Sequence, residues 1–145
     1  MSGERPPSRV KQMNGVEPAL SQALPRAVGV LIVDDQEPFR AVASTLVSLL
    51  PGWHVVGAVD SGEDAVRAAQ DTQPDLILMD MNLPGISGIE ATRQITATLP
   101  GVLVVLVSTY AADDLPEDAL ACGAAAYVRK EDLTPRALRA LLAGS

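Results

Sequence analysis

Three carboxylates follow two short apolar runs of the chain. The run 30–33 is followed by Asp34 and Asp35, and the run 76–79 is followed by Asp80. Runs that are apolar at consecutive positions and bounded by turn residues are typical of strands buried on both faces of a parallel sheet. Ligands bind such sheets at the carboxyl ends of the strands. The three acids are therefore expected to form an anionic oxygen cluster, which favours a hard divalent cation.

Mg²⁺ is the cation that this donor set fits best, because it prefers oxygen ligands in near-octahedral geometry and keeps several waters. We expect Asp35 and Asp80 to bind it directly, with the main-chain carbonyl of Asn82 as a third ligand. Asp34 is expected to act through water. The alternative is that these acids only cap helices and lie in solvent, but acids at two separate strand ends favour the metal site.

Two further polar residues follow apolar runs. Ser108 comes after the run 104–107, where its hydroxyl would donate to a phosphate oxygen beside the metal, although such residues also commonly begin helices. Lys130 comes after the run 125–128, where its ammonium would oppose the carboxylates at rest and a phosphoryl group when one is present. The alternative for a single lysine is an ordinary solvated charge.

Composition excludes several classes of protein. The 145 residues are enough for one domain with an aliphatic core, and the net charge of −7 argues against nonspecific nucleic-acid binding. Cys122 is the only cysteine, so neither an intramolecular disulfide nor a cysteine zinc site is expected. No apolar stretch approaches the roughly 20 residues needed to span a bilayer, and no signal peptide is apparent. We therefore expect a cytoplasmic protein.

Apolar runs alternate with amphipathic segments from Val28 onward. Strands are expected over 28–33, 54–59, 75–79, 102–107 and 125–128, and helices over 38–50, 62–72, 88–98, 114–122 and 133–143. This alternation predicts an α/β fold with a doubly wound, five-stranded parallel sheet and helices on both faces. Residues 1–27 are rich in Pro, Ser, Gly and Gln and are expected to form a flexible tail, which leaves 28–145 as the folded domain.

The chain from Val28 to Leu142 resembles the receiver domain of bacterial two-component response regulators. The resemblance rests on the residues that stand in the family's order and spacing: Asp34, Asp35, Asp80, Ser108, Tyr127 and Lys130. The segments 79–85 and 123–130 are similar to the family's phosphorylation loop and fifth-strand motif. The residues around Ser108 and Lys130 are more similar to the subfamily that often carries a C-terminal helix-turn-helix. The resemblance implies a flavodoxin-like fold with strand order 2-1-3-4-5.

The resemblance also implies a mechanism. Asp80 would accept a phosphoryl group from the histidine of a sensor kinase or phosphotransfer protein with the help of Mg²⁺. Lys130 and Ser108 would contact that group, and Tyr127 would turn inward as Ser108 moves. The fourth helix, fifth strand and fifth helix would then present the changed surface. For Tyr127, an ordinary half-buried strand aromatic is the alternative.

We expect a stand-alone receiver that signals to a protein target. The sequence ends just beyond the fifth helix, so no DNA-binding or enzymatic output domain is expected, nor any direct contact with nucleic acid or membrane. The protein would be a monomer or a phosphorylation-dependent dimer, and would promote only its own phosphorylation and dephosphorylation. A rival is a phosphatase of the haloacid dehalogenase type, which requires a second Asp where this chain has Asn82. A third possibility is a scaffold that does not depend on phosphorylation, which the intact set of site residues disfavours.

Overall fold

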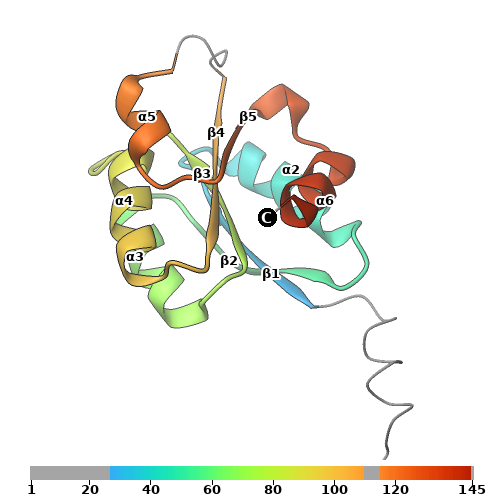
Figure 1. Cartoon of the computed structure of the whole chain (residues 1–145). Helices are drawn as coiled ribbons and strands as arrows, with labels where there is room; N and C mark the ends of the chain where they lie inside the picture. Colours follow the sequence, from blue (N-terminus) through green and yellow to red (C-terminus); the bar gives the residue numbers. More distant parts are fainter. Residues whose placement is uncertain (1–26, 110–114, 145) are drawn as a thin grey trace, which may run out of the picture.

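The computed structural model describes residues 27–109 and 115–144 (Figure 1). The tail expected over 1–27 lies outside the described residues, except for Ala27. The elements are β1 (Val28–Val33), α2 (Glu37–Ser48), β2 (Trp53–Val59), α3 (Gly62–Thr72), β3 (Leu76–Asp80), α4 (Gly88–Thr98), β4 (Leu103–Ser108), α5 (Glu117–Ala121), β5 (Ala126–Arg129) and α6 (Pro135–Ala143). A 3₁₀ turn over Lys130–Asp132 joins β5 to α6.

The five strands form one parallel sheet in the order β2-β1-β3-β4-β5. This confirms the predicted doubly wound α/β fold and the 2-1-3-4-5 order. Every residue of β1 and of β3 is buried, as their consecutive apolar side chains predict for strands covered on both faces. The edge strand β2 is only partly buried.

Helices cover both faces of the sheet, and each face has its own apolar cluster. Helices α3, α4 and α5 lie on one face, where their side chains pack with Leu31, Met79 and Leu106 (left side of Figure 1). Helices α2 and α6 lie on the other face, where they pack with Ile32, Leu78 and Val107. Alternate residues of each strand face opposite sides, so a single strand supplies both clusters.

Three strands begin and end one residue later than expected. Asp80 pairs with Val107 and Ser108 pairs with Arg129, so these polar residues continue the ladder and belong to the strand ends. Pairing with a neighbouring strand therefore extends each strand into the site, which apolar periodicity alone does not indicate. Asp80 and Ser108 are therefore held in place by the hydrogen bonding of the sheet.

The helices expected at 114–122 and 133–143 are shorter than predicted. Pro116 precedes α5 with an extended backbone (φ −61°, ψ 152°), so the helix begins at Glu117 and not within the preceding turn. Thr134 caps α6 by accepting a hydrogen bond from the Ala137 amide, and the residues before it form the 3₁₀ turn. Ser61 and Ser87 cap α3 and α4 in the same way.

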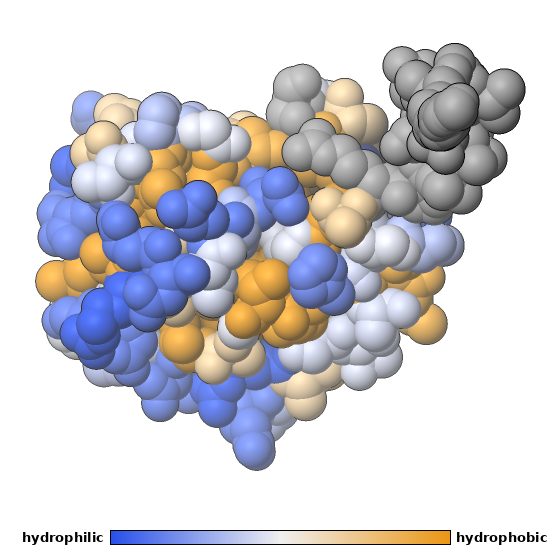
Figure 2. Space-filling view, turned by 90° about the horizontal axis from the view of Figure 1, so that it is seen from below, coloured by the Kyte–Doolittle hydropathy of each residue, from blue (hydrophilic) through white to orange (hydrophobic). Residues whose placement is uncertain are grey.

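The underside of the molecule corresponds to the amino ends of the strands. Figure 2 shows patches of apolar side chains there, separated by polar ones. One shallow hollow lies between the start of the last two strands and the end of α6; it is lined by Leu103, Val105, Ala125, Ala126, Ala140, Leu141 and Gly144. Neither it nor a second hollow near Pro74 and Pro100 includes an acid of the predicted site. Within the described ranges, no helix has the length and apolar character needed to cross a membrane.

Candidate functional site

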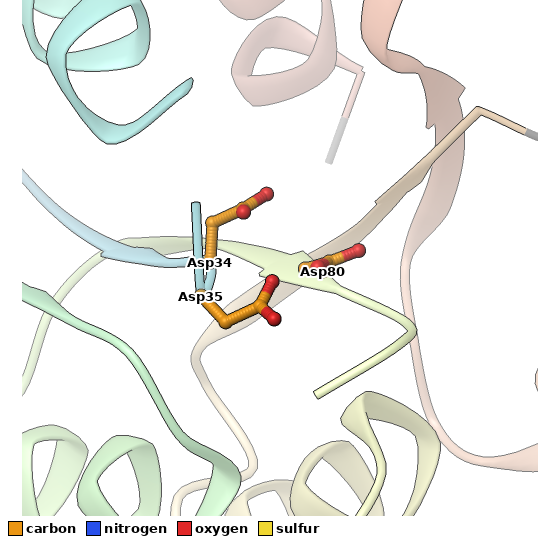
Figure 3. Close-up of side chains that lie close together, drawn as sticks. All are labelled: Asp34, Asp35 and Asp80. Carbon is orange, nitrogen blue, oxygen red and sulfur yellow. The ribbon is translucent and has the colours of Figure 1, made fainter. Parts of the chain in front are cut away.

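The candidate site lies where the winding of the sheet reverses, at the carboxyl ends of β1 and β3. Connections from these adjacent strands leave to opposite faces, which opens a crevice at this edge. Figure 3 shows that the side chains of Asp34 and Asp35 leave the chain on opposite sides and that Asp80 approaches from the neighbouring strand. One oxygen from each acid lies within 4.8 Å of the others. The structure thus brings together the three acids that the sequence singles out.

Burial and the repulsion between the carboxylates destabilise the ionised form of Asp80. Asp80 is 6% exposed, and burial, followed by the charge of Asp34, raises its pKa to about 6. The nearby charge of Lys130 and the backbone amide of Asn82, whose N lies 3.4 Å from Asp80 Oδ1, oppose this rise, and Asp35 adds slightly to it. A divalent cation would relieve the repulsion, and one or two carboxylates together with waters, which this cluster can supply, are the donor set that Mg²⁺ takes. The residues present therefore fit the predicted ion.

Asp34 is fully buried, and both of its carboxylate oxygens have protein partners. Oδ1 accepts a hydrogen bond from the Gln36 amide at 2.8 Å, and Oδ2 lies 2.7 Å from Lys130 Nζ. Oδ2 has no further hydrogen-bond partner among the described residues. The Arg40 guanidinium also donates to the Asp34 carbonyl at 2.7 Å, which fixes the turn from β1 into α2. These contacts favour the indirect, water-mediated role predicted for Asp34.

Lys130 places its positive charge beside the cluster. It begins the 3₁₀ turn after β5, its side chain is 16% exposed, and its ammonium lies 4.6 Å from the centre of the Phe39 ring. The alternative of a solvated charge is therefore wrong. Sequence reasoning missed Phe39; the available signal is that this single phenylalanine falls in the first turn of the helix that follows the acid pair.

The loop after Asp80 is held close to the sheet. An added Cβ on Gly88 would lie 1.9 Å from the Asp80 carbonyl oxygen, so only glycine allows α4 to begin there. Glu63 at the start of α3 accepts a hydrogen bond from the Ile86 amide at 3.1 Å. Sequence reasoning did not identify Glu63. Asn82 is exposed in this loop, and its carbonyl stays a predicted ligand.

Ser108 and Tyr127 lie on the two remaining strands. Ser108 is 1% exposed at the end of β4, and Tyr127 of β5 pairs with Leu106, two residues before Ser108. Residues two apart on a strand share a face, so the half-buried Tyr127 lies along the same side of the sheet as Ser108. Tyr127 packs against the cluster formed by α3, α4 and α5. The movement of Tyr127 towards Ser108 stays a prediction.

Comparison with known proteins identifies a family. Residues 30–143 match the family model of the response regulator receiver domain. The response regulator GacA of Pseudomonas viridiflava is 39% identical over 103 residues, which cover 71% of this chain and 48% of that protein. The response regulator UvrY of Escherichia coli is 38% identical over the same share of this chain and 47% of its own. The chain thus spans about half the length of these curated relatives.

Solved structures show the same fold. The receiver domain of the putative response regulator NarL from Mycobacterium tuberculosis has a TM-score of 0.75 and 28% identity, over 83% of this chain and all of that one. A LuxR-family response regulator from Aurantimonas has a TM-score of 0.73 and 31% identity, over 81% of this chain and 86% of that one. The receiver domain of the sensor kinase PA1611 from Pseudomonas aeruginosa has a TM-score of 0.71 and 30% identity, over 82% of this chain and 99% of that one. That last structure holds a magnesium ion in its active-site cleft.

Proposed function

Because the chain belongs to the response regulator receiver domain family of two-component systems, we propose that Asp80 accepts a phosphoryl group and that the folded domain reports its presence. The observation that carries this proposal is the cluster of Asp34, Asp35 and Asp80 oxygens within 4.8 Å, closed by Lys130 at 2.7 Å from Asp34. We assign the receiver to residues 28–145 and the preceding residues to a tail.

The phosphoryl donor is a phosphohistidine of a sensor kinase or phosphotransfer protein. An oxygen of the Asp80 carboxylate forms a bond to phosphorus while the bond from phosphorus to the imidazole nitrogen breaks. The bonding electrons go to that nitrogen, which is protonated by water. No general base is required, because a carboxyl with a pKa of about 6 is already mostly ionised at pH 7.

Other residues of this chain would hold the metal ion and contact the phosphoryl group. Asp35, Asp80 and the Asn82 carbonyl would hold Mg²⁺, which when bound neutralises charge on the acids and on the incoming phosphoryl oxygens. Lys130 supplies a second positive contact to the phosphoryl group, and the Ser108 hydroxyl donates to one of its oxygens. Asp34 orients Lys130 at rest. The buried positions of Asp34 and Ser108 support these assignments, since water competes little there.

The signal leaves through the surface formed by α5, β5 and α6. Movement of Ser108 towards the phosphoryl group frees space on the side of the sheet where Tyr127 lies, and Tyr127 turns into it. The partner is a protein that distinguishes these two arrangements. Since the family works with histidine kinases, we place this step in the cytoplasm.

Acetyl phosphate with Mg²⁺, read by intact mass, tests the proposal. Wild type should gain the mass of one phosphoryl group, and Asp80→Asn should gain none. Asp60→Asn is the matched control, because Asp60 follows β2 as Asp34 follows β1 but lies exposed outside the cluster. Tryptophan fluorescence is unsuitable, because Trp53 begins β2 at the opposite end of the sheet. An unmodified wild type, or a modified Asp80→Asn, would contradict the proposal.

The same purified protein can be used to test the alternative that the chain is a phosphatase. A haloacid dehalogenase-type enzyme would turn over p-nitrophenyl phosphate, whereas a receiver should not. The match of residues 30–143 to the receiver family supports the second outcome.

A further inference from the structure

The ammonium of Lys130 lies between two groups that attract it differently. Asp34 Oδ2 is 2.7 Å away, and the centre of the Phe39 ring is 4.6 Å away. The 4.6 Å distance lies within the range of about 6 Å in which a cation interacts with an aromatic face. Only 16% of the lysine side chain is exposed, so water weakens these attractions little.

The ring is itself held in place by local structure. Pro38 occupies the first turn of α2, and the Phe39 amide donates to the Gln36 carbonyl at 3.1 Å. The side chain is half-buried against the apolar cluster that includes Leu138. Phe39 therefore presents a fixed face to a lysine that has four rotatable side-chain bonds.

The two contacts have different consequences for a lysine that has to reach a phosphoryl group on Asp80. The ion pair with Asp34 holds the ammonium at rest, but it competes with a phosphoryl oxygen for the same positive charge. An aromatic face attracts the ammonium without carrying a net negative charge, so it can keep contact while the ammonium changes its anionic partner. Phe39 thus keeps the Lys130 ammonium close to Asp34 and Asp80, both before and after Asp80 is phosphorylated.

We propose that Phe39 is a positioning residue for phosphoryl transfer, acting through Lys130. This inference rests on the proposed function of Asp80 and adds the residue that keeps the lysine in reach. Phe39 would touch neither the metal nor the phosphoryl group. Its loss should therefore slow phosphorylation while the affinity for Mg²⁺ stays unchanged.

The ring contact is tested first, without any phosphorylation. Lys11 and Lys130 are the only lysines, so lysine-selective ¹³C labelling gives two resolvable side-chain signals. Ring current over the Phe39 face should shift the Lys130 Hε signal upfield of its Lys11 counterpart. Phe39→Leu should remove that shift, and Phe39→Tyr should keep it. A Lys130 signal that is the same in wild type and Phe39→Leu would overturn the inference.

The second measurement is the rate of phosphorylation by acetyl phosphate at saturating Mg²⁺. Phe39→Leu should be slower by on the order of fivefold, the factor that one such contact supplies, and Phe39→Tyr or Phe39→Trp should restore the rate. In a Lys130→Met background the Phe39→Leu change should have no further effect. Leu46→Ala is the matched control, because Leu46 lies on the same helix and packs against the same cluster.

The outcomes separate this inference from the proposed function. If wild type is phosphorylated and Phe39→Leu reacts at the same rate, the positioning role is wrong and the function stands. If Leu46→Ala slows the reaction as much as Phe39→Leu, the effect is one of helix packing and the inference fails. If wild type is not phosphorylated at all, the proposed function and the positioning role fail together, whatever the lysine signals show.

Discussion

Lys130 Nζ lies 2.7 Å from Asp34 Oδ2, although β3 and β4 separate the strands from which these residues come. The lysine follows β5 and the aspartate follows β1, so the ion pair extends over the carboxyl ends of the two strands that carry Asp80 and Ser108. This contact links the two outer members of the site at rest. It also makes Lys130 and Asp34 depend on each other for stability.

Lys130→Met should lower the free energy of unfolding by about 3 kcal/mol in the absence of divalent cations, because it leaves the fully buried Asp34 carboxylate without its cation. Urea titration in the presence of a chelator measures the change. Arg129→Met is the matched control: Arg129 pairs with Glu131 at the surface, where such a pair contributes less than about 1 kcal/mol. Equal losses in the two variants would contradict the buried ion pair.

Asp80→Asn should be more stable than wild type at pH 8 without metal, and the gain should vanish as the pH falls. The pKa of Asp80 is raised from 3.8 to about 6, so the folded state binds this proton more tightly than the unfolded chain. The stabilising contribution of the proton is complete below about pH 4 and is lost as the pH rises through 6. Urea titrations at pH 5 and pH 8 give the comparison. A gain that does not change with pH would be inconsistent with this assignment.

Mg²⁺ should bind more tightly at pH 8 than at pH 5.5, because a proton on Asp80 competes with the ion. Asp35→Asn should weaken binding by more than about tenfold, since it removes one of two expected carboxylate ligands. Isothermal titration calorimetry measures both effects. Asp60→Asn serves as the control and should bind as wild type does. Wild-type affinity in Asp35→Asn would exclude Asp35 as a ligand.

Gly88→Ala should destabilise the domain by about 2–3 kcal/mol and slow phosphorylation roughly tenfold. The new methyl group would lie 1.9 Å from the Asp80 carbonyl oxygen, so either α4 or the end of β3 has to move. Gly101→Ala provides the comparison, because nothing lies within 4 Å of a Cβ at that position. Thermal unfolding and intact mass report the two effects. If both variants behaved alike, the close approach at Gly88 would have no functional importance.

The larger features of the fold were predictable from local patterns. Buried parallel strands show consecutive apolar residues, and Ser61 and Ser87 mark helix starts because a hydroxyl satisfies a free backbone amide. The topology of a doubly wound sheet then places the ends of β1 and β3 side by side. The meeting of Asp34, Asp35 and Asp80 was therefore predictable, because local patterns located the strand ends and the resemblance to the receiver family supplied the strand order.

The environment of Lys130 was not predictable in the same way. Whether this lysine is solvated or enclosed depends on Asp34 and Phe39, which belong to the opposite end of the chain and approach it only through packing of the sheet. The start of α5 at Glu117 and the extension of β3 to Asp80 likewise depend on local backbone angles and on strand pairing. The sequence by itself determined which acids follow strands, because periodicity is a local property, and its family resemblance indicated that these strand ends lie side by side at one edge of the sheet. Only the tertiary structure decided what holds the lysine against that edge, because side-chain contacts between distant segments depend on how the whole domain packs.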